Sequence, residues 1–160
     1  MVISRLRPLG VKLDFGDRSY KLGGTINITV ELNPRGDVEV REGRVDLVCE
    51  VRWREISTVK VLASRGGMRK LGGYAPPTAW VTKQVTKERK ETYVHSTVVF
   101  LTNYQLHSGA PGRYNARLDI QPEPPAHAAE GSVNWKLVTA IDVAGARDVT
   151  RKRKVQVTVD

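Results

Sequence analysis

The sequence predicts an all-β fold, an antiparallel β-sandwich of the immunoglobulin-like kind. Short runs in which apolar and polar residues alternate recur along the chain, and a period of two is that of a strand with one buried face. Turn residues separate these runs, and no segment has the 3.6-residue period of an amphipathic helix. Short alternating strands divided by turns are typical of sandwiches.

Length and composition indicate one globular domain over residues 1–160. The chain is 40% hydrophobic and 27% charged, a balance that excludes a disordered chain. No stretch approaches the roughly 20 apolar residues that a membrane span requires. The first ten residues lack the apolar run of a signal peptide, so we expect a cytoplasmic protein. The single cysteine excludes an internal disulfide.

The first half of the chain is organised around a predicted hairpin. Residues 2–15 predict one or two short strands broken at residues 8–10, and a turn follows at residues 16–19. The stretch Tyr20–Trp53 then predicts a strand, a turn at residues 33–37 that contains Pro and Gly, and a long second strand. We expect this hairpin to form the inner part of the sandwich.

The second strand of the hairpin changes phase at a glycine. Val38 and Val40 place the apolar face on even numbers, and after Gly43 it moves to odd numbers, beginning at Val45. Such a change indicates either a β-bulge or a strand that crosses from one sheet to the other. On the odd-numbered face Cys49 points inward, where cysteines are usually inert.

Residues 57–91 differ from the rest and predict an exposed insertion. Their centre holds four glycines and two prolines, and no core pattern survives there. A long insertion in a small sandwich is either functional or disordered. After it, alternation predicts strands at residues 92–101, 114–120, 133–143 and 155–159. The proline-rich connection at residues 121–132 is excluded as a central strand.

These residues resemble the N-terminal domain of the arrestin-like family. Tyr20, a Gly-Gly pair, an alternating strand and the V-E-V-x-x-G-R-V-D-L strand from Val38 follow the family's order. In the second half, the segments that resemble the family are Ser108–Tyr114, Pro124–His127, Gly131–Ala140 and Asp142–Asp148. The family's P-G-E turn is replaced by Leu22-Gly23-Gly24. Members usually carry two sandwiches, whereas this chain has room for one.

The resemblance implies a function in binding other proteins. The family consists of adaptors, trafficking subunits and bacterial sporulation-control proteins, none of them enzymes. The insertion at residues 57–91 has no counterpart that we can place, and the phosphate-sensing residues of animal arrestins match no position here. We therefore expect a non-enzymatic adaptor or scaffold module, with a protein partner or a second copy paired through an edge strand.

Residues with catalytic or metal-binding chemistry are scattered. His95, His107 and His127 lack the short spacings of a zinc site, and we expect His95 to be a structural residue within a strand. The glycines around residues 66–73 do not form a phosphate-binding loop, and no G-x-S-x-G motif is present. We expect no enzyme activity, no cofactor and no metal.

The strongest functional candidate is a basic cluster in the insertion. The net charge of +9 and the pI of about 9.9 favour an anionic partner such as nucleic acid or an acidic protein, or simply aid solubility. If the insertion is a β-ribbon, its two arms bring their charges together. The candidate partner-binding residues are Arg65, Arg69, Lys70, Tyr74, Trp80, Lys83, Lys87, Arg89 and Lys90. A solvated loop with ordinary lysines is the alternative. A second basic run, Arg151–Lys154, predicts a charged edge that discourages aggregation.

Overall fold

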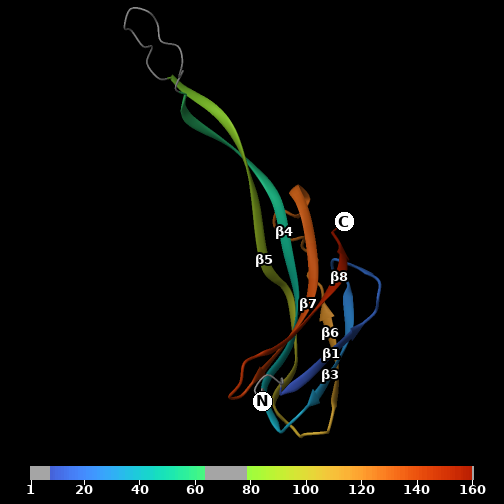
Figure 1. The fold of residues 1–160 in the computed structure, drawn as a ribbon. Helices are drawn as coiled ribbons and strands as arrows, with labels where there is room; N and C mark the ends of the chain where they lie inside the picture. The colour runs from blue at the N-terminus through green and yellow to red at the C-terminus, as the bar shows by residue number, and fades with distance from the viewer. Residues whose placement is uncertain (1–7, 64–78, 160) are drawn as a thin grey trace, which may run out of the picture.

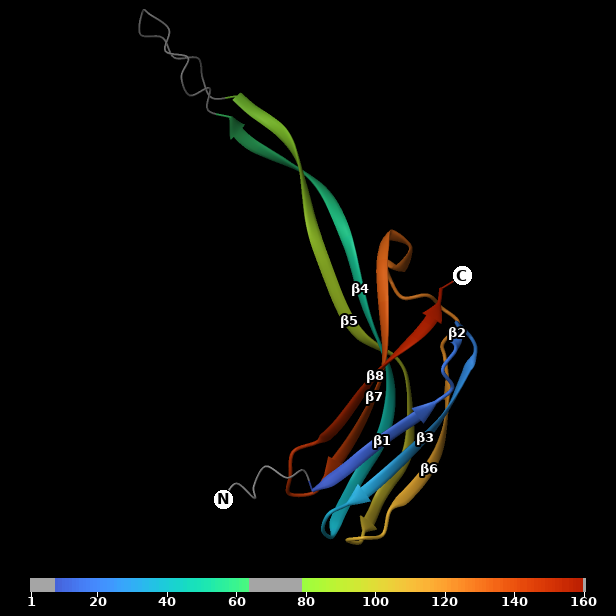
Figure 2. The ribbon, with the colours of Figure 1, turned by 45° about the vertical axis from the view of Figure 1, so that its right-hand side comes forward.

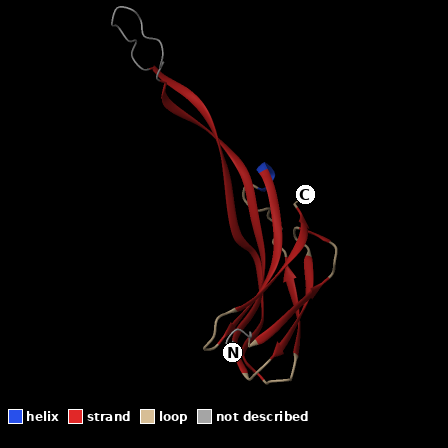
Figure 3. Cartoon of the chain, viewed as in Figure 1, coloured by secondary structure: helices blue, strands red, loops and turns tan. Residues whose placement is uncertain are grey.

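The chain folds into two packed β-sheets, as the alternating pattern predicts. The computed structural model describes residues 8–63 and 79–159. In these two ranges strands make up almost all of the regular structure, and a short 3-10 turn, η2 (Ala128–Glu130), precedes β7 (Figures 1 and 3). The strands are β1 (Leu9–Phe15), β2 (Ser19–Lys21), β3 (Thr25–Pro34), β4 (Val38–Ala63), β5 (Ala79–Leu106), β6 (Gly112–Asp119), β7 (Gly131–Val143) and β8 (Val149–Thr158).

The two sheets differ in size. The smaller has the order β1-β3-β6, and the larger has the order β2-β8-β7-β4-β5. Neighbouring strands run antiparallel, as predicted, except that the short β2 pairs in parallel with β8. Apolar side chains from both sheets fill the space between them, among them Ile28 and Val30 of β3 and Leu47 of β4. This arrangement is a β-sandwich.

The predicted hairpin is wrong, because its two strands lie in different sheets. β3 pairs with β1 and β6, whereas β4 pairs with β5 and β7. Pro34 still belongs to the β1–β3 ladder, and the backbone N–H of Arg35 donates to the carbonyl oxygen of Pro8 at 3.0 Å. The turn therefore carries the chain across the core. Each of the two strands has one apolar face. When the strands lie in different sheets, these faces pack against each other and both are removed from water. Pairing the strands side by side in one sheet would leave both apolar faces uncovered.

The phase change lies just before Gly43 and is a bulge. The pairing of β4 with β7 shifts register between Val40 and Glu42, so Arg41 is the extra residue of β4. The buried positions accordingly change from Val40 to Gly43 and Val45. β4 stays in the larger sheet throughout, so the alternative in which it crosses between sheets is wrong. A Cβ on Gly43 would lie 2.8 Å from the Phe100 ring, which explains the need for glycine here.

The arms of the insertion form a two-stranded ribbon. β4 and β5 remain paired from Arg54 and Glu88 to Ala63 and Ala79, beyond the last β4–β7 pair at Trp53 and Gly131. We call residues 54–63 and 79–88 the ribbon; it projects from the sandwich in Figures 1 and 2. The glycine- and proline-rich centre of the insertion, residues 64–78, lies outside the described residues. The β-branched residues along both arms favour the strand conformation.

The basic run in β8 lies on a sheet edge, as predicted. Among the described residues, positions 149–155 of β8 pair with β7 only, and all four side chains of Arg151–Lys154 are exposed. Arg153 also links the two sheets: its guanidinium donates to the carbonyl oxygen of Leu13 at 2.8 Å and lies 5.1 Å from the Phe15 ring centroid. Arg153 therefore connects the two sheets on this side of the sandwich, while the run as a whole forms an exposed edge of the larger sheet.

A row of polar and aromatic side chains lies at one end of the core. Cys49 is buried as predicted, its thiol lies 3.7 Å from the carbonyl oxygen of Tyr93, and burial raises the pKa of this thiol. His95 is 3.0 Å from the carbonyl oxygen of Gln121 through Nε2, and its ring meets Trp135 edge-on. These contacts confirm that His95 is a structural residue. Burial, with a smaller effect from Cys49, raises the pKa of Tyr93 to about 12.

Among the described residues, no helix is long and apolar enough to cross a membrane.

We expect Gly131→Ala to destabilise the fold. A Cβ at this position would overlap the carbonyl oxygen of Arg52, so β7 would have to move away from β4 where the ribbon begins. Overpacking of this kind costs about 1–3 kcal/mol or more. The control is Gly36→Ala, where nothing lies within 4 Å of the added Cβ. Urea denaturation should show a lower unfolding free energy for Gly131→Ala alone, and equal stabilities would contradict the close approach.

We expect Tyr93 to make stability fall at high pH. Its folded pKa of about 12 lies above the ordinary value of 10. The unfolded chain therefore loses this proton first, and the stabilising contribution disappears as pH rises from 10 through 12. Tyr93→Phe should lack this part of the decline in unfolding free energy between pH 9 and 12. Identical pH profiles for the two proteins would show that the Tyr93 phenol is not shielded from water.

Candidate interaction surface

The apolar face of the ribbon continues the face that β4 buries in the sandwich. From the Cys49–Tyr93 pair to the end of the ribbon, odd-numbered residues of β4 pair with odd-numbered residues of β5, so they share one face. Within the sandwich, this face buries Val45 to Val51. On the ribbon it carries the valines Val59, Val61, Val81 and Val85. We call these four residues the valine face.

The valine face is open to solvent. Val59, Val61 and Val81 are 38%, 40% and 45% exposed, and among the described residues no second sheet covers them. In the sandwich, the smaller sheet provides that cover. The same sequence pattern that builds the core of the sandwich is thus left without a packing partner where β4 and β5 extend beyond it.

The opposite, even-numbered face of the ribbon is more polar but holds two large apolar side chains. Ile56 and Trp80 are each 68% exposed. Their cross-strand neighbours are Thr86 and Leu62, and Lys60 pairs with Thr82 between them. Both faces therefore offer apolar contacts, with the valine face presenting the more continuous row.

Ion pairs neutralise the basic residues at the base of the ribbon. Arg89 donates to Glu55 at 2.8 Å. Glu50 accepts from Arg52 at 2.8 Å and lies 3.6 Å from Lys90. The hydrogen bond from Arg52, followed by the charge of Lys90, lowers the pKa of Glu50, so this carboxylate stays ionised. Arg89 and Lys90, two of the predicted binding residues, thus already have acidic partners.

The lysines further along the ribbon are different. Lys83 and Lys87 lie on the valine face, opposite Val59 and Glu55, and Lys60 lies on the other face. Among the described residues these three lysines make no ion pair. The free positive charge is therefore located in the middle of the ribbon, beside the exposed valines.

The nine residues predicted from the sequence are only partly brought together. Lys83, Lys87 and Arg89 share one face of β5, whereas Trp80 and Lys90 lie on the opposite face. The remaining four, Arg65, Arg69, Lys70 and Tyr74, lie outside the described residues. The valine face was not predicted from the sequence, although Val59 and Val61 stand two residues apart in one arm and Val81 lies in the other.

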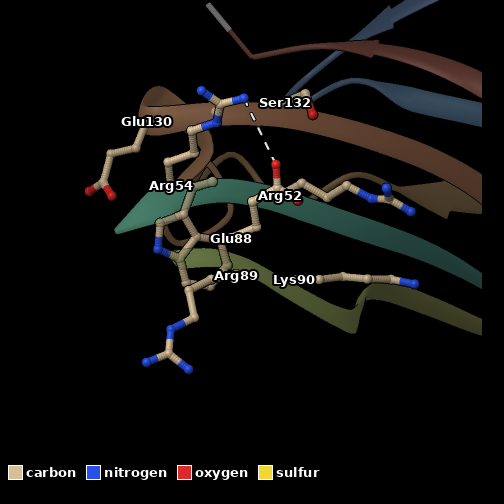
Figure 4. Close-up of a pocket in the computed structure, with 9 residues that line it drawn as sticks. Arg52, Arg54, Glu88, Arg89, Lys90, Glu130 and Ser132 are labelled. Carbon is tan, nitrogen blue, oxygen red and sulfur yellow. Dashed lines mark ion pairs between the residues drawn. The ribbon is translucent and has the colours of Figure 1, made fainter. Parts of the chain in front are cut away.

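A shallow pocket of about 620 Å³ lies at the base of the ribbon. Figure 4 shows Arg54 paired with Glu88 across it, at 3.8 Å, with Arg89 pointing away from Arg52 and Lys90. Trp53 lines one side and stacks on His127 with ring centroids 4.2 Å apart. Arg52, Trp53 and Arg54 were not predicted from the sequence, since alternating charges usually mark a solvated strand face.

The pocket has the chemistry of a polar contact surface. Its charged groups lie largely in ion pairs that are open to water and easily exchanged. Among the described residues, no group of three or more His, Cys, Asp or Glu side chains is placed to hold a metal. The arrangement suits exchange of ion pairs with a partner surface.

Comparison with known proteins gives a match at the level of fold. No family model and no curated protein matches the chain. The crystal structure of Spo0M, a sporulation control protein from Bacillus subtilis, matches with a TM-score of 0.55 and 14% sequence identity. The match covers 95% of this chain and 50% of Spo0M, so the chain spans about half of that protein's length.

A second solved structure has a lower similarity. AvmM, which catalyses macrocyclization in alchivemycin A biosynthesis, has a TM-score of 0.38 and 9% identity over 93% of this chain and 89% of its own. A similarity at this level carries no argument about the chain. The match to Spo0M is a match of fold, and it confirms the β-sandwich that the alternating sequence pattern predicts.

Proposed function

We propose that the chain is a non-enzymatic, cytoplasmic protein-interaction module whose partner binds the valine face of the ribbon. The observation that carries this proposal is the continuity of β4. Its core-facing side extends past the sandwich as an exposed row of valines beside two lysines, Lys83 and Lys87, that make no ion pair with a described residue. Spo0M is a sporulation control protein, and its shared fold supports a regulatory role by analogy only.

Burial of the ribbon by a partner is energetically favourable. A two-stranded hairpin on its own is at best marginally stable in water, because only one side of each strand is paired and no core covers it. Completely burying a valine contributes on the order of 1.5–3 kcal/mol, and these valines are already more than half buried. Covering Val59, Val61 and Val81 therefore supplies part of the binding energy and stabilises the ribbon at the same time.

The charges next to the valine face indicate the chemistry of the partner. Lys83 and Lys87 lie on the same face as the valines and lack acidic partners among the described residues. Interfaces commonly have an apolar centre and a charged rim, and complementary charges accelerate association. We therefore propose a partner that has an apolar contact surface with carboxylates at its edge.

Site-specific photo-cross-linking tests this proposal. A photoreactive residue at position 83 should cross-link one acidic protein in cells, whereas the same residue at position 113, an exposed site on β6 of the smaller sheet, should not. With the partner identified, Val61→Asp and the pair Lys83→Glu and Lys87→Glu should each weaken binding by about tenfold or more, since a buried charge and reversed rim charges both oppose docking.

Arg113→Glu is the matched control and should leave the affinity within twofold of the original protein. Each variant should keep the original melting temperature within a few degrees, because all four substituted side chains are exposed or partly exposed. A partner whose affinity is unchanged by the ribbon substitutions, or that cross-links equally from position 113, contradicts binding through the ribbon.

Binding of a nucleic acid or another polyanion is the second candidate. It is favoured by the three unpaired lysines on the ribbon, Lys60, Lys83 and Lys87, and by the exposed indole of Trp80, on which a base can stack. Arg89 and Lys90 support it less, because Glu55 and Glu50 already neutralise them.

If a polyanion binds here, its affinity should fall steeply with salt. Each phosphate contact contributes about −0.7 to −0.9 to the slope of log K against log salt. Lys83→Glu together with Lys87→Glu should make that slope shallower by the contribution of about two phosphate contacts. Fluorescence anisotropy with a labelled single-stranded oligonucleotide at several salt concentrations measures the slope. The absence of binding at low salt would exclude this candidate and leave the protein partner.

A further inference from the structure

The larger sheet opens into a fork between β7 and β8. From Ile141 to Trp135, β7 pairs with residues 149–155 of β8. Beyond that point β8 turns away, and residues 156–158 pair with β2 instead. Figure 2 shows the carboxyl end of β8 curving away from β7 toward β2. In the described chain, residues 131–134 of β7 therefore pair with β4 on one side only.

The fork contains a groove of about 920 Å³. One wall is formed by Val133 to Lys136 of β7, and the other by Lys154 to Thr158 of β8. Phe15 and the turn before β2 line it further. This volume is within the range of sites that hold a small ligand or a short peptide. The groove combines backbone groups that lack a strand partner with side chains of two kinds.

The two kinds of side chain lie on opposite faces of the sheet. Odd-numbered residues on both walls, Val133, Val155 and Val157, point toward the core and are buried or partly buried. Even-numbered residues, among them Asn134 and Gln156, are exposed on the outer face. If a strand is placed between the walls, every second side chain of that strand faces apolar groups, and the side chains between them face polar groups.

Two lysines meet at the closed end of the groove. Lys136 of β7 pairs directly with Lys154 of β8, and like charges placed opposite each other in a sheet are destabilising. Neither lysine makes an ion pair with a described residue. Glu50 also lines the groove and its charge interacts with Lys136, but Arg52 and Lys90 already share this carboxylate. An incoming carboxylate would relieve the repulsion between the two lysines.

We infer that the fork binds an extended peptide segment of a partner protein in which acidic and apolar residues alternate. The segment adds as a strand to residues 131–134 of β7, so its backbone occupies the open edge. Its apolar side chains pack on Val133 and Val157, and its carboxylates approach Lys136 and Lys154. This surface is separate from the ribbon, and the inference does not rest on the function proposed above.

The charge of the fork distinguishes this occupant from a segment of the chain itself. The first seven residues carry Arg5 and Arg7 and no acidic residue. Those two arginines would add to the repulsion between Lys136 and Lys154. Arg18 and Arg52 also line the groove, against Asp17 and Glu50. The balance of charge therefore favours an acidic segment from another protein.

Fluorescence anisotropy with a labelled, end-capped (Glu-Val)4 peptide tests the inference. We expect saturable binding that weakens with salt. The (Lys-Val)4 peptide should bind at least tenfold more weakly, as should a (Glu-Val)4 peptide with alternate backbone nitrogens methylated, because methylation removes the donors needed for strand pairing. Equal affinity for the methylated peptide would overturn the strand-addition geometry.

Variants locate the binding site. Lys136→Glu combined with Lys154→Glu should reduce the affinity for (Glu-Val)4 at least tenfold and improve that for (Lys-Val)4, while Lys12→Glu on β1 should change neither more than twofold. Hydrogen exchange supplies a second readout with the unaltered protein: the peptide should slow exchange at residues 131–134. An unchanged affinity in the double variant, or protection found only on the ribbon, would overturn the inference.

Discussion

The continuous pairing of β4 with β5 is the interaction on which the rest of the structure depends. β4 lies between β7 and the edge strand β5 of the larger sheet, where its odd-numbered side chains supply much of that sheet's contribution to the core. The bulge at Arg41, just before Gly43, sets this phase, because it moves the apolar face of β4 from Val40 to Gly43 and Val45. The later odd-numbered residues of β4, in the sandwich and on the ribbon, keep the orientation that this bulge gives.

Both candidate surfaces arise where strands of unequal length leave the sheet. β4 and β5 extend past the end of β7 and form the ribbon, whose face then lacks the cover that the smaller sheet provides elsewhere. β8 leaves β7 for β2 and forms the fork. In each case the strand face that points toward the core remains apolar beyond the point where the neighbouring strand or sheet that covers it ends. The structure thus offers two separate positions at which another chain can complete what the sandwich leaves open.

The sequence predicted the faces of the strands better than their neighbours. Alternation identified the buried positions of β3 and β4, the change of phase near Gly43 and the inward orientation of Cys49, because these depend only on local period. The same period does not specify which strand lies alongside, so the predicted hairpin of β3 with β4 was wrong and the change of phase was left open between a bulge and a crossing strand. For the candidate site, basic residues drew attention to the two arms that form the ribbon. Their ion pairs with Glu50 and Glu55 depend on cross-strand register, which local pattern does not reveal.

In the free protein β4 and β5 form a paired ribbon whose valine face is exposed to solvent. Backbone hydrogen exchange of the isolated chain measures this pairing. Amides paired across residues 54–62 and 80–88 should exchange at least tenfold more slowly than those of the exposed turn at residues 145–148, though faster than those of the buried part of β4. Exchange of the ribbon amides at the rate of the turn would show that the ribbon is not paired before a partner binds.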